Sequence, residues 1–217
     1  MTKILLITGD GGEALEVMYP YQRLLEEGYD VDVAAPSAKK IQLVVHDGEA
    51  GWDTFSEKWG YRLNANLAFS EVEPEKYAGL VIPGGRAPEY IRNDSNVKRI
   101  VRYFFDNNLP VAHICHAALI LAAAGVLKGR ESSGFPFVQI DIENAGGTYI
   151  DGGGVVDKNM VSARAWSDNP IWMREFMAVL RKHIGKTKTA GNGQTPSEEG
   201  ADDRLARLEL QVRQLEK

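Results

Sequence analysis

Cysteine is almost absent from this sequence, because Cys115 is the only one in 217 residues. A single cysteine excludes an internal disulfide and is typical of a reducing compartment, so we expect a cytoplasmic protein. An excess of positive charge is also lacking, since the formal net charge is −5. We therefore expect neither nucleic acid nor an anionic membrane surface as a partner. The apolar run at residues 3–8 is too short for a signal peptide or a membrane span.

Paired metal-ligand spacings are missing too. His113, Cys115 and His116 lie close together and His46 precedes them, but no CxxC or HxxxH pair accompanies them. We expect no metal site.

The segment GDGGEA (9–14) matches a dinucleotide fingerprint, G-x-G-x-x-A, after an apolar run. Glu13 would place a carboxylate where the pyrophosphate must lie, and the run at 29–36 ends without the acid that binds ribose hydroxyls. We expect no nucleotide and no other cofactor.

Short apolar runs alternate with helical patterns along the chain. This alternation predicts an α/β fold: a doubly wound, mostly parallel sheet between layers of helices. Strands are expected at 3–8, 29–36, 78–85 and 109–114, a hairpin at 153–164, and helices at 13–28, 97–108, 116–127 and 170–184. In such sheets ligands bind at the carboxyl ends of the strands, so the loops GDGGE, PGGRAPE and the one at Cys115 should meet at one edge.

Two segments are less regular. In the first helix Leu15, Met18, Leu24 and Leu25 are expected to form the buried face, with a kink at Pro20. Residues 44–63 are rich in tryptophan, glycine and charge without a regular period, and are interpreted as an excursion that packs aromatic rings over the core or over a cleft.

Composition divides the chain into three parts. Residues 1–185 form the expected folded domain, and residues 186–202 lack large apolar side chains and are expected to be a flexible linker. Residues 203–217 carry leucine and valine at 3-4-3 spacing, which predicts a short amphipathic helix, either a frayed tail or a small coiled coil.

Cys115 lies between an expected strand and an expected helix, the arrangement of a nucleophile elbow. Unpaired N–H groups at a helix start lower a thiol pKa, so we expect a reactive thiolate; the alternative is a buried, inert thiol. Sequence adjacency does not show that the His116 ring touches the sulfur. The backbone N–H groups of His116 and Gly85 could hold an oxyanion. Glu13 is interpreted either as an acid that shares a proton with the thiolate or as a favourable charge in a first helical turn.

Three of these motifs together resemble the ThiJ/PfpI superfamily, which includes the Parkinson-disease deglycase, the glyoxalases III and PfpI-type cysteine hydrolases. They are EALEVMYPYQRLLEEGYDV, VIPGGRAPE and ICH, in that order, and the resemblance spans residues 3 to about 185. The stretch VHDGEAGWDTFSEKWGY is similar to a segment of plant-type tandem glyoxalases.

The resemblance implies a flavodoxin-like, class I glutamine-amidotransferase-like sandwich that forms a homodimer or higher homo-oligomer. It implies Cys115 as nucleophile, Glu13 as the carboxyl beside its sulfur, Gly85 and His116 as oxyanion donors, and Glu89 reaching His116 from a neighbouring subunit. Ala117 stands where the family usually has glycine, and its methyl group could narrow the pocket.

These residues lead to one main functional hypothesis: a cysteine-dependent glyoxalase III or deglycase that acts on small aldehydes or glycated substrates. Cys115 would form a hemithioacetal, and Glu13, or His116 supported by Glu89, would move the proton. The alternatives are a PfpI-type peptidase and a non-catalytic, chaperone-like redox sensor. A class I amidotransferase is disfavoured, since RKHIG (181–185) lacks the required His-x-Glu pair.

Overall fold

The structure is a computed structural model that describes residues 2–190. Strand β1 (Lys3–Ile7) lies inside the sheet because four of its five residues are apolar and fully buried. Their side chains alternate between the two faces of the sheet. Ile4 and Leu6 belong to one hydrophobic cluster, and Leu5 and Ile7 to the other. A strand buried on both faces is typical of an α/β sandwich.

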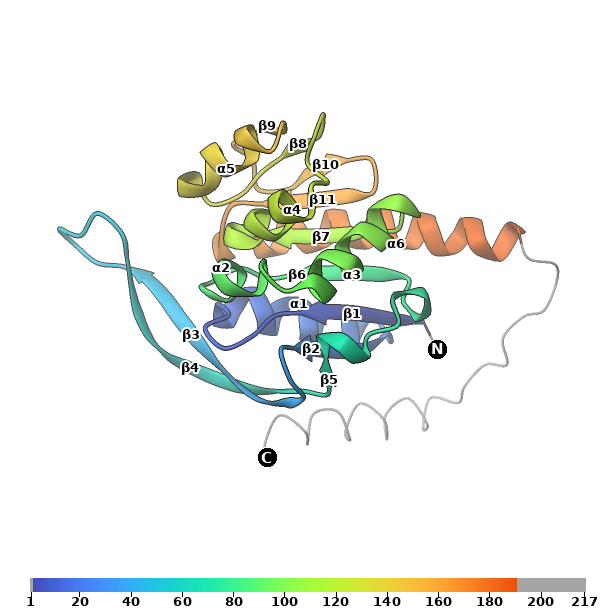
Figure 1. Cartoon of the computed structure of the whole chain (residues 1–217), viewed down its shortest axis with the longest axis horizontal. Helices are drawn as coiled ribbons and strands as arrows, with labels where there is room; N and C mark the ends of the chain where they lie inside the picture. The colour runs from blue at the N-terminus through green and yellow to red at the C-terminus, as the bar shows by residue number, and fades with distance from the viewer. Residues whose placement is uncertain (1, 191–217) are drawn as a thin grey trace.

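The main sheet has seven strands in the order β10–β11–β7–β6–β1–β2–β5 (Figure 1). All of its pairings are parallel except the antiparallel pair β10–β11. The predicted doubly wound, mostly parallel sheet is therefore confirmed. The strands are β1, β2 (Asp30–Ala35), β5 (Leu67–Ala68), β6 (Gly79–Ile82), β7 (Val111–Ile114), β10 (Val155–Asp157) and β11 (Met160–Ala163).

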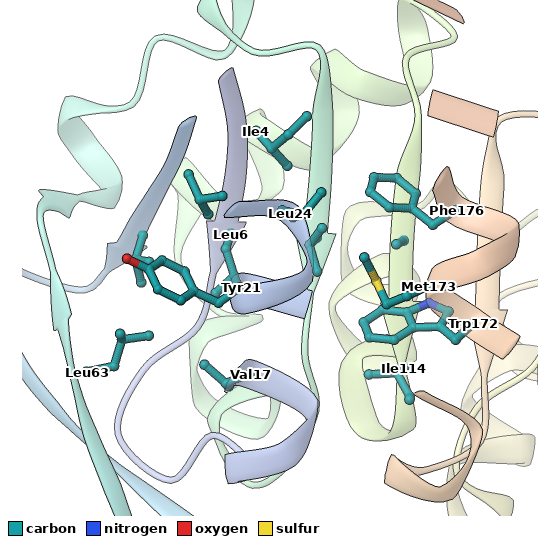
Figure 2. Packing of buried hydrophobic residues seen from close by; sticks show 14 of the residues in the cluster. Ile4, Leu6, Val17, Tyr21, Leu24, Leu63, Ile114, Trp172, Met173 and Phe176 are labelled. Carbon is teal, nitrogen blue, oxygen red and sulfur yellow. The ribbon is translucent and has the colours of Figure 1, made fainter. Parts of the chain in front are cut away.

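Helices cover both faces of this sheet. One layer consists of α1 (Ala14–Glu26) and α6 (Asn169–Ala190), whose side chains include Val17, Leu24, Trp172 and Phe176 in a shared core with β1 and β7 (Figure 2). The other layer consists of α2 (Ala87–Ile91), α3 (Ser95–Asp106), α4 (Ala118–Ala124) and α5 (Gln139–Asn144). Within residues 2–190 no helix has both the length and the apolar character that crossing a membrane requires.

The strand order reverses beside β1, because β2 pairs with one side of it and β6 with the other. Such a switch point leaves a crevice at the carboxyl ends of the strands. The loop after β1 and the loop after β6 meet there, with an isolated bridge between Gly12 and Gly85. Cys115 follows β7, the next strand along.

Residues 44–63 differ from the irregular excursion that we expected. They belong to a long antiparallel hairpin of β3 (Lys39–Gly48) and β4 (Phe55–Ala65), which projects from the body of the molecule (Figure 1). A one-residue irregularity between Gln42 and Val44 shifts the register, and this bulge hides the period-2 pattern in the sequence. A bridge between Glu13 and Val44 joins the hairpin to the loop after β1.

Two smaller expectations are also wrong. Leu15 is 53% exposed, because the buried face of α1 runs through Val17, Tyr21 and Leu24 instead. Helix α6 continues to Ala190, so residues 186–190 are helical and not part of a flexible linker. The rest of that linker and the expected helix at 203–217 lie outside the described residues.

Short elements complete the chain. They are the two-stranded sheet of β8 (Glu131–Ser132) and β9 (Thr148–Tyr149), and the 3₁₀ turns η1 (Phe69–Glu71), η2 (Pro74–Lys76), η3 (Cys115–Ala117), η4 (Pro136–Val138) and η5 (Trp166–Asp168). The turn η3 lies between β7 and α4 and carries Cys115.

Candidate active site

Cys115 adopts a backbone conformation that residues other than glycine rarely adopt. Its φ is 60°, whereas Ile114 before it is extended and Ala118 after it is helical. The change from strand to left-handed to helical conformation makes a sharp elbow, as the strand–cysteine–helix pattern predicted. A left-handed conformation costs a residue with a Cβ about 1–2 kcal/mol, so the rest of the fold must hold Cys115 in place.

This strain predicts a stability difference between two variants. Cys115→Gly should be about 1 kcal/mol more stable than Cys115→Ala, because only glycine adopts the left-handed conformation without penalty. Chemical denaturation of both variants measures the difference. Equal stability, or a more stable alanine variant, would show that the elbow carries no strain.

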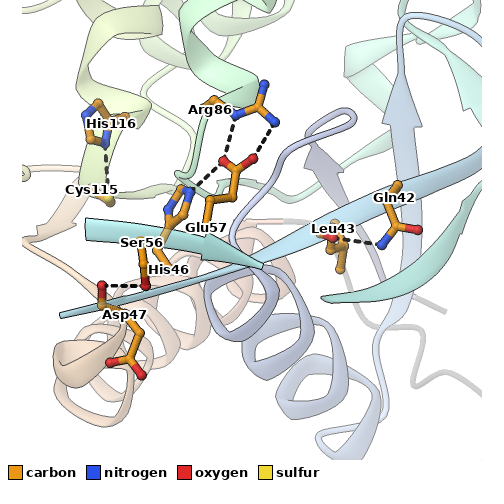
Figure 3. Close-up of polar contacts among 9 residues, drawn as sticks. All are labelled: Gln42, Leu43, His46, Asp47, Ser56, Glu57, Arg86, Cys115 and His116. Carbon is orange, nitrogen blue, oxygen red and sulfur yellow. Dashed lines mark hydrogen bonds and ion pairs between the residues drawn. The ribbon is translucent and has the colours of Figure 1, made fainter. Parts of the chain in front are cut away.

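Besides the Glu16 carboxyl described below, three hydrogen-bonding groups surround the sulfur. The His116 Nδ1 atom lies 3.3 Å from Cys115 Sγ, so the adjacent ring does contact the sulfur (Figure 3). The backbone N–H groups of Gly85 and His116 also point at Sγ. These are the two groups expected as oxyanion donors.

The resting thiol is less acidic than its place at a helix start led us to expect. Cys115 is only 4% exposed, and this burial raises the pKa of the thiol well above its ordinary value. The Gly85 and His116 N–H groups lower it, but burial and the nearby Glu16 charge outweigh them. Burial therefore opposes the thiolate that we expected, and a neighbouring base such as Glu16 can take the thiol proton as the sulfur reacts.

The carboxyl group beside the sulfur belongs to Glu16 and not to Glu13. Glu16 is completely buried, and its Oε2 accepts a hydrogen bond of 2.9 Å from the Gly84 N–H. A Cβ built on Gly84 would lie 2.5 Å from Glu16 Oε2 and 3.0 Å from Cys115 Sγ, so both atoms face the same point. Burial and the charge of Glu13 raise the pKa of Glu16 to about 8. Glu16 can therefore hold or accept a proton near neutral pH.

Glu13 has the helix-start position that we gave as its alternative. Its Oε2 accepts a 2.8 Å hydrogen bond from the Glu16 N–H, which caps α1. The cap fixes the first turn and so sets the direction in which Glu16 points. Glu16 was not among the residues expected here, although an acid four residues before Pro20 and eight before Leu24, on a buried helix face, is a usable signal.

Gly84 and Gly85 allow the loops to approach this closely. A Cβ on Gly85 would lie 2.3 Å from the Glu13 nitrogen, and the φ of Gly85 is 81°. Any side chain at either position would therefore push the loop after β6 away from the sulfur or from the loop after β1.

A polar network from the β3–β4 hairpin flanks the cysteine and histidine. Arg86 donates two 2.7 Å hydrogen bonds to the Glu57 carboxylate, and Glu57 Oε2 lies 3.0 Å from His46 Nε2 (Figure 3). The Arg86 guanidinium lowers the pKa of Glu57 to about 2, so this carboxylate is ionised at neutral pH. His46 packs on Phe55 with ring centroids 4.1 Å apart, and the edge of Phe55 meets His116. In the sequence, His46 stands out only as a potential metal ligand, and no pattern there indicates this network.

Two other residues of the sequence analysis lie elsewhere. Glu89 is exposed on α2, and within residues 2–190 it forms no hydrogen bond to the His116 ring. Its contact from a neighbouring subunit stays a prediction. Ala117 is fully buried in the core beneath α4.

The residues present do not offer a nucleotide or metal site. The N–H groups that would hold a phosphate are used within the protein, since those of Gly11, Gly12 and Glu13 donate to Gln42, Gly9 and Gly84 carbonyls. Among the described residues, no three histidine, cysteine or acidic side chains are grouped to hold a metal ion.

Two buried histidines make the stability of the fold depend on pH. Burial lowers the pKa of His113 to about 3 and that of His116 to about 4, so both are neutral in the folded chain. In the unfolded chain they take up protons below about pH 6.5. For these two groups the unfolded state then binds more protons, so they lower the stability as the pH drops below 6.5. Glu16 acts in the opposite direction, because its pKa of about 8 makes the folded state take up a proton over the same pH range.

In Glu16→Gln, which removes this opposing titration, we expect the free energy of unfolding to drop by about 2–3 kcal/mol between pH 7.5 and pH 5.5, roughly 1.4 kcal/mol for each histidine. The melting temperature should fall by about 5–10 °C, measured by calorimetry at both pH values. His113→Gln should remove about half of this drop. An unchanged melting temperature in Glu16→Gln would contradict the neutral burial of both rings.

Comparison with known proteins shows which family this chain belongs to. The DJ-1/PfpI family model matches residues 2–179. "Deglycase TK1284" of Thermococcus kodakarensis is 42% identical over 179 residues, which are 82% of this chain and 99% of the relative. "Protein DJ-1 homolog D" of Arabidopsis thaliana is 39% identical over 82% of this chain and 47% of its own length. The crystal structure of Drosophila melanogaster DJ-1beta has the same fold, with a TM-score of 0.68 at 19% identity over 86% of this chain and 97% of that one.

The family model covers most of the chain, and several curated relatives align over nearly their whole length. The elbow cysteine, the adjacent histidine and the buried helix acid all lie within the matched region. The predicted resemblance is confirmed: the chain belongs to the DJ-1/PfpI family.

Proposed function

We propose that this protein is a cysteine-dependent deglycase of the glyoxalase III type, which acts on small α-oxoaldehydes such as methylglyoxal and on their early adducts with amines and thiols. One observation carries the proposal: Cys115 Sγ, His116 Nδ1 and the Glu16 carboxyl meet at the end of β7 beside two backbone N–H groups. Four relatives at 41–42% identity are named deglycases, which supports this reading.

The geometry suggests how the first step proceeds. Glu16, in its ionised form, takes the thiol proton as Sγ attacks the aldehyde carbon of methylglyoxal, and a C–S bond forms. The oxygen that becomes negative is held by the Gly85 and His116 N–H groups and is then protonated, giving a hemithioacetal. With an amine adduct the same attack breaks the C–N bond, and the amine leaves with a proton from Glu16 or His116.

The second step moves hydrogen within the bound three-carbon unit. A base removes the proton from the carbon attached to sulfur, and the ketone carbon is protonated through an enediol, giving a thioester of lactate. The neutral His116 ring, whose Nδ1 is 3.3 Å from Sγ, is placed for this transfer. Water then hydrolyses the thioester to lactate and the free thiol. No electrons are gained or lost overall, so no redox cofactor is needed.

The depth of the sulfur favours small substrates. A thiol that is 4% exposed can reach the terminal carbon of an aldehyde, whereas the carbonyl of an extended peptide chain is flanked by bulky groups. This observation favours the small-carbonyl enzyme over the PfpI-type peptidase.

Lactate formation from methylglyoxal by the purified chain tests the proposal, and a second measurement separates the two activities. The rate of amine release from a methylglyoxal adduct is compared with the rate of its spontaneous dissociation. Release faster than dissociation shows direct action on the adduct. Lactate formation limited by dissociation shows a glyoxalase that acts only on the free aldehyde. No lactate from either substrate would overturn the proposal.

A further inference from the structure

The polar network of Arg86, Glu57 and His46 joins two elements that flank the sulfur. Glu57 and His46 belong to the β3–β4 hairpin, whereas Arg86 directly follows Gly85, whose N–H points at Sγ. Arg86 is itself anchored, because its backbone N–H donates a 2.8 Å hydrogen bond to the Gly11 carbonyl. The two hydrogen bonds from Arg86 to Glu57 therefore fasten the hairpin to the loop after β6 (Figure 3).

The backbone of His46 is held against the loop after β1. Two residues before it, the Val44 N–H donates a 2.9 Å hydrogen bond to the Gly12 carbonyl. The backbone N–H of His46 points at the Glu13 carboxylate. Because these contacts fix the main chain of β3 here, the direction of the His46 ring depends on what its side chain contacts.

Glu57 sets the direction of the His46 ring. The His46 side chain is only 2% exposed, and its Nε2 lies 3.0 Å from Glu57 Oε2. The Arg86 guanidinium keeps the Glu57 carboxylate ionised at neutral pH. An ionised carboxylate can only accept hydrogen bonds, so Nε2 is the His46 nitrogen that carries a proton.

Phe55 lies between the rings of His46 and His116. The rings of His46 and Phe55 pack with centroids 4.1 Å apart, and Phe55 stands at 83° to His116 with centroids 6.0 Å apart. Phe135 also stacks on the His116 ring, with centroids 5.2 Å apart. The His116 ring, whose Nδ1 is 3.3 Å from Sγ, is thus packed by two phenylalanines, and one of them depends on His46 for support.

We propose that Glu57 and His46 are positioning residues that keep the His116 ring beside the Cys115 sulfur. The Glu57 carboxylate fixes the His46 ring, and that ring supports Phe55. This role rests on the proposed function, since the position of His116 affects a rate only if His116 takes part in turnover. The ring contacts themselves require no reaction and can be measured separately.

Glu57→Gln tests this role, because it removes the charge with little change in volume. The kcat for lactate formation from methylglyoxal should fall about 10- to 100-fold, the size of effect that a small displacement of a reacting group can have. KM should change by less than about twofold, because neither residue is proposed to contact the substrate. Arg86→Lys keeps a cation but loses the paired hydrogen bonds to Glu57, so it should show a smaller loss in the same direction.

Asp47→Asn is the matched control. Asp47 is an exposed acid next to His46 in the same strand, and within the described residues its carboxylate accepts a hydrogen bond only from the Gly48 N–H. This variant should leave kcat and KM unchanged. An equal loss of kcat in Asp47→Asn and Glu57→Gln would overturn the proposal, and so would an unchanged kcat in Glu57→Gln.

A double-mutant cycle shows whether Glu57 acts through His116. In the background of His116→Ala, Glu57→Gln should cause no further loss of kcat, because the ring that it positions is already absent. Equal losses in the two backgrounds would overturn the proposal. Melting curves show that each variant is folded, and the NMR measurement below decides where the His116→Ala background is too slow to measure.

Nitrogen NMR of the imidazole rings follows the same contacts without turnover. The chain has only four histidines, so the signals of His46 and His116 can be assigned by single substitutions. In the native chain His46 Nε2 should carry a slowly exchanging proton. Glu57→Gln should lose this slow exchange and shift the His116 signals, whereas Asp47→Asn should change neither.

The two readouts separate the two proposals. If the native chain forms no lactate but Glu57→Gln shifts the His116 signals, the proposed function fails while the support of the ring stands. If the native chain forms lactate and the His116 signals do not respond to Glu57→Gln, the positioning role fails while the proposed function stands.

Discussion

Cys115→Ser is expected to lower kcat/KM for methylglyoxal by at least about three orders of magnitude. The serine hydroxyl has nearly the size of the thiol, but it is a far weaker nucleophile and its proton is much harder to remove. The fold should persist, since the substitution retains the Cβ and the polar contact with His116. The measurement is lactate formation at matched protein concentration, with melting curves to show that the variant is folded.

The same variant separates the enzyme from the redox-sensor alternative. A sensor would consume peroxide once for each Cys115 thiol and form no lactate from methylglyoxal. Lactate formation by Cys115→Ser at close to the native rate would remove the nucleophile from the mechanism, whatever the oxidation of the native thiol shows.

Glu16→Gln is expected to lower kcat by about 10²- to 10⁴-fold, the usual range for loss of a general acid or base. Glutamine retains an acceptor for the Gly84 N–H, so the loop geometry should survive. In the native protein kcat/KM should rise with pH up to about 8, because the base form of Glu16, whose pKa is about 8, is the form that takes the thiol proton. Glu16→Gln should lose that inflection.

Glu13→Gln is the matched control for Glu16→Gln. Its amide oxygen still caps α1, so kcat should change only a few-fold, and any effect should fall on stability, by about 1 kcal/mol or less. If Glu13→Gln removed activity and Glu16→Gln did not, the original assignment of Glu13 would be restored. The same substitution at two acids only three residues apart is thus expected to leave kcat nearly unchanged at Glu13 and to lower it strongly at Glu16.

The sheet and the elbow position of Cys115 could be predicted from the sequence because both depend on local patterns. Buried parallel strands appear as continuous apolar runs, and the loops after β1, β6 and β7 had to converge once the strands were parallel. The left-handed elbow at Cys115 is also indicated locally, because this residue lies directly between a strand pattern and a helix pattern.

The acid beside the sulfur could not be chosen in this way, because both Glu13 and Glu16 follow the same strand. Which of them faces Cys115 depends on where α1 begins, and the Glu13 cap sets that residue. The raised pKa of the Cys115 thiol could not be predicted either, because the N–H groups at the helix start lower this pKa whereas burial raises it. The hairpin network of His46, Glu57 and Arg86 requires a strand pairing that a bulge hides.

Because Cys115 is buried and is the only cysteine, its labelling also reports local opening of the folded protein. A bulky maleimide cannot reach a thiol whose residue, Cys115, is only 4% exposed, so its labelling rate would follow local opening of the elbow rather than chemistry at the sulfur. With no second cysteine to compete, pulse labelling along a denaturant series would read the free energy of those excursions from a single, unambiguous mass shift.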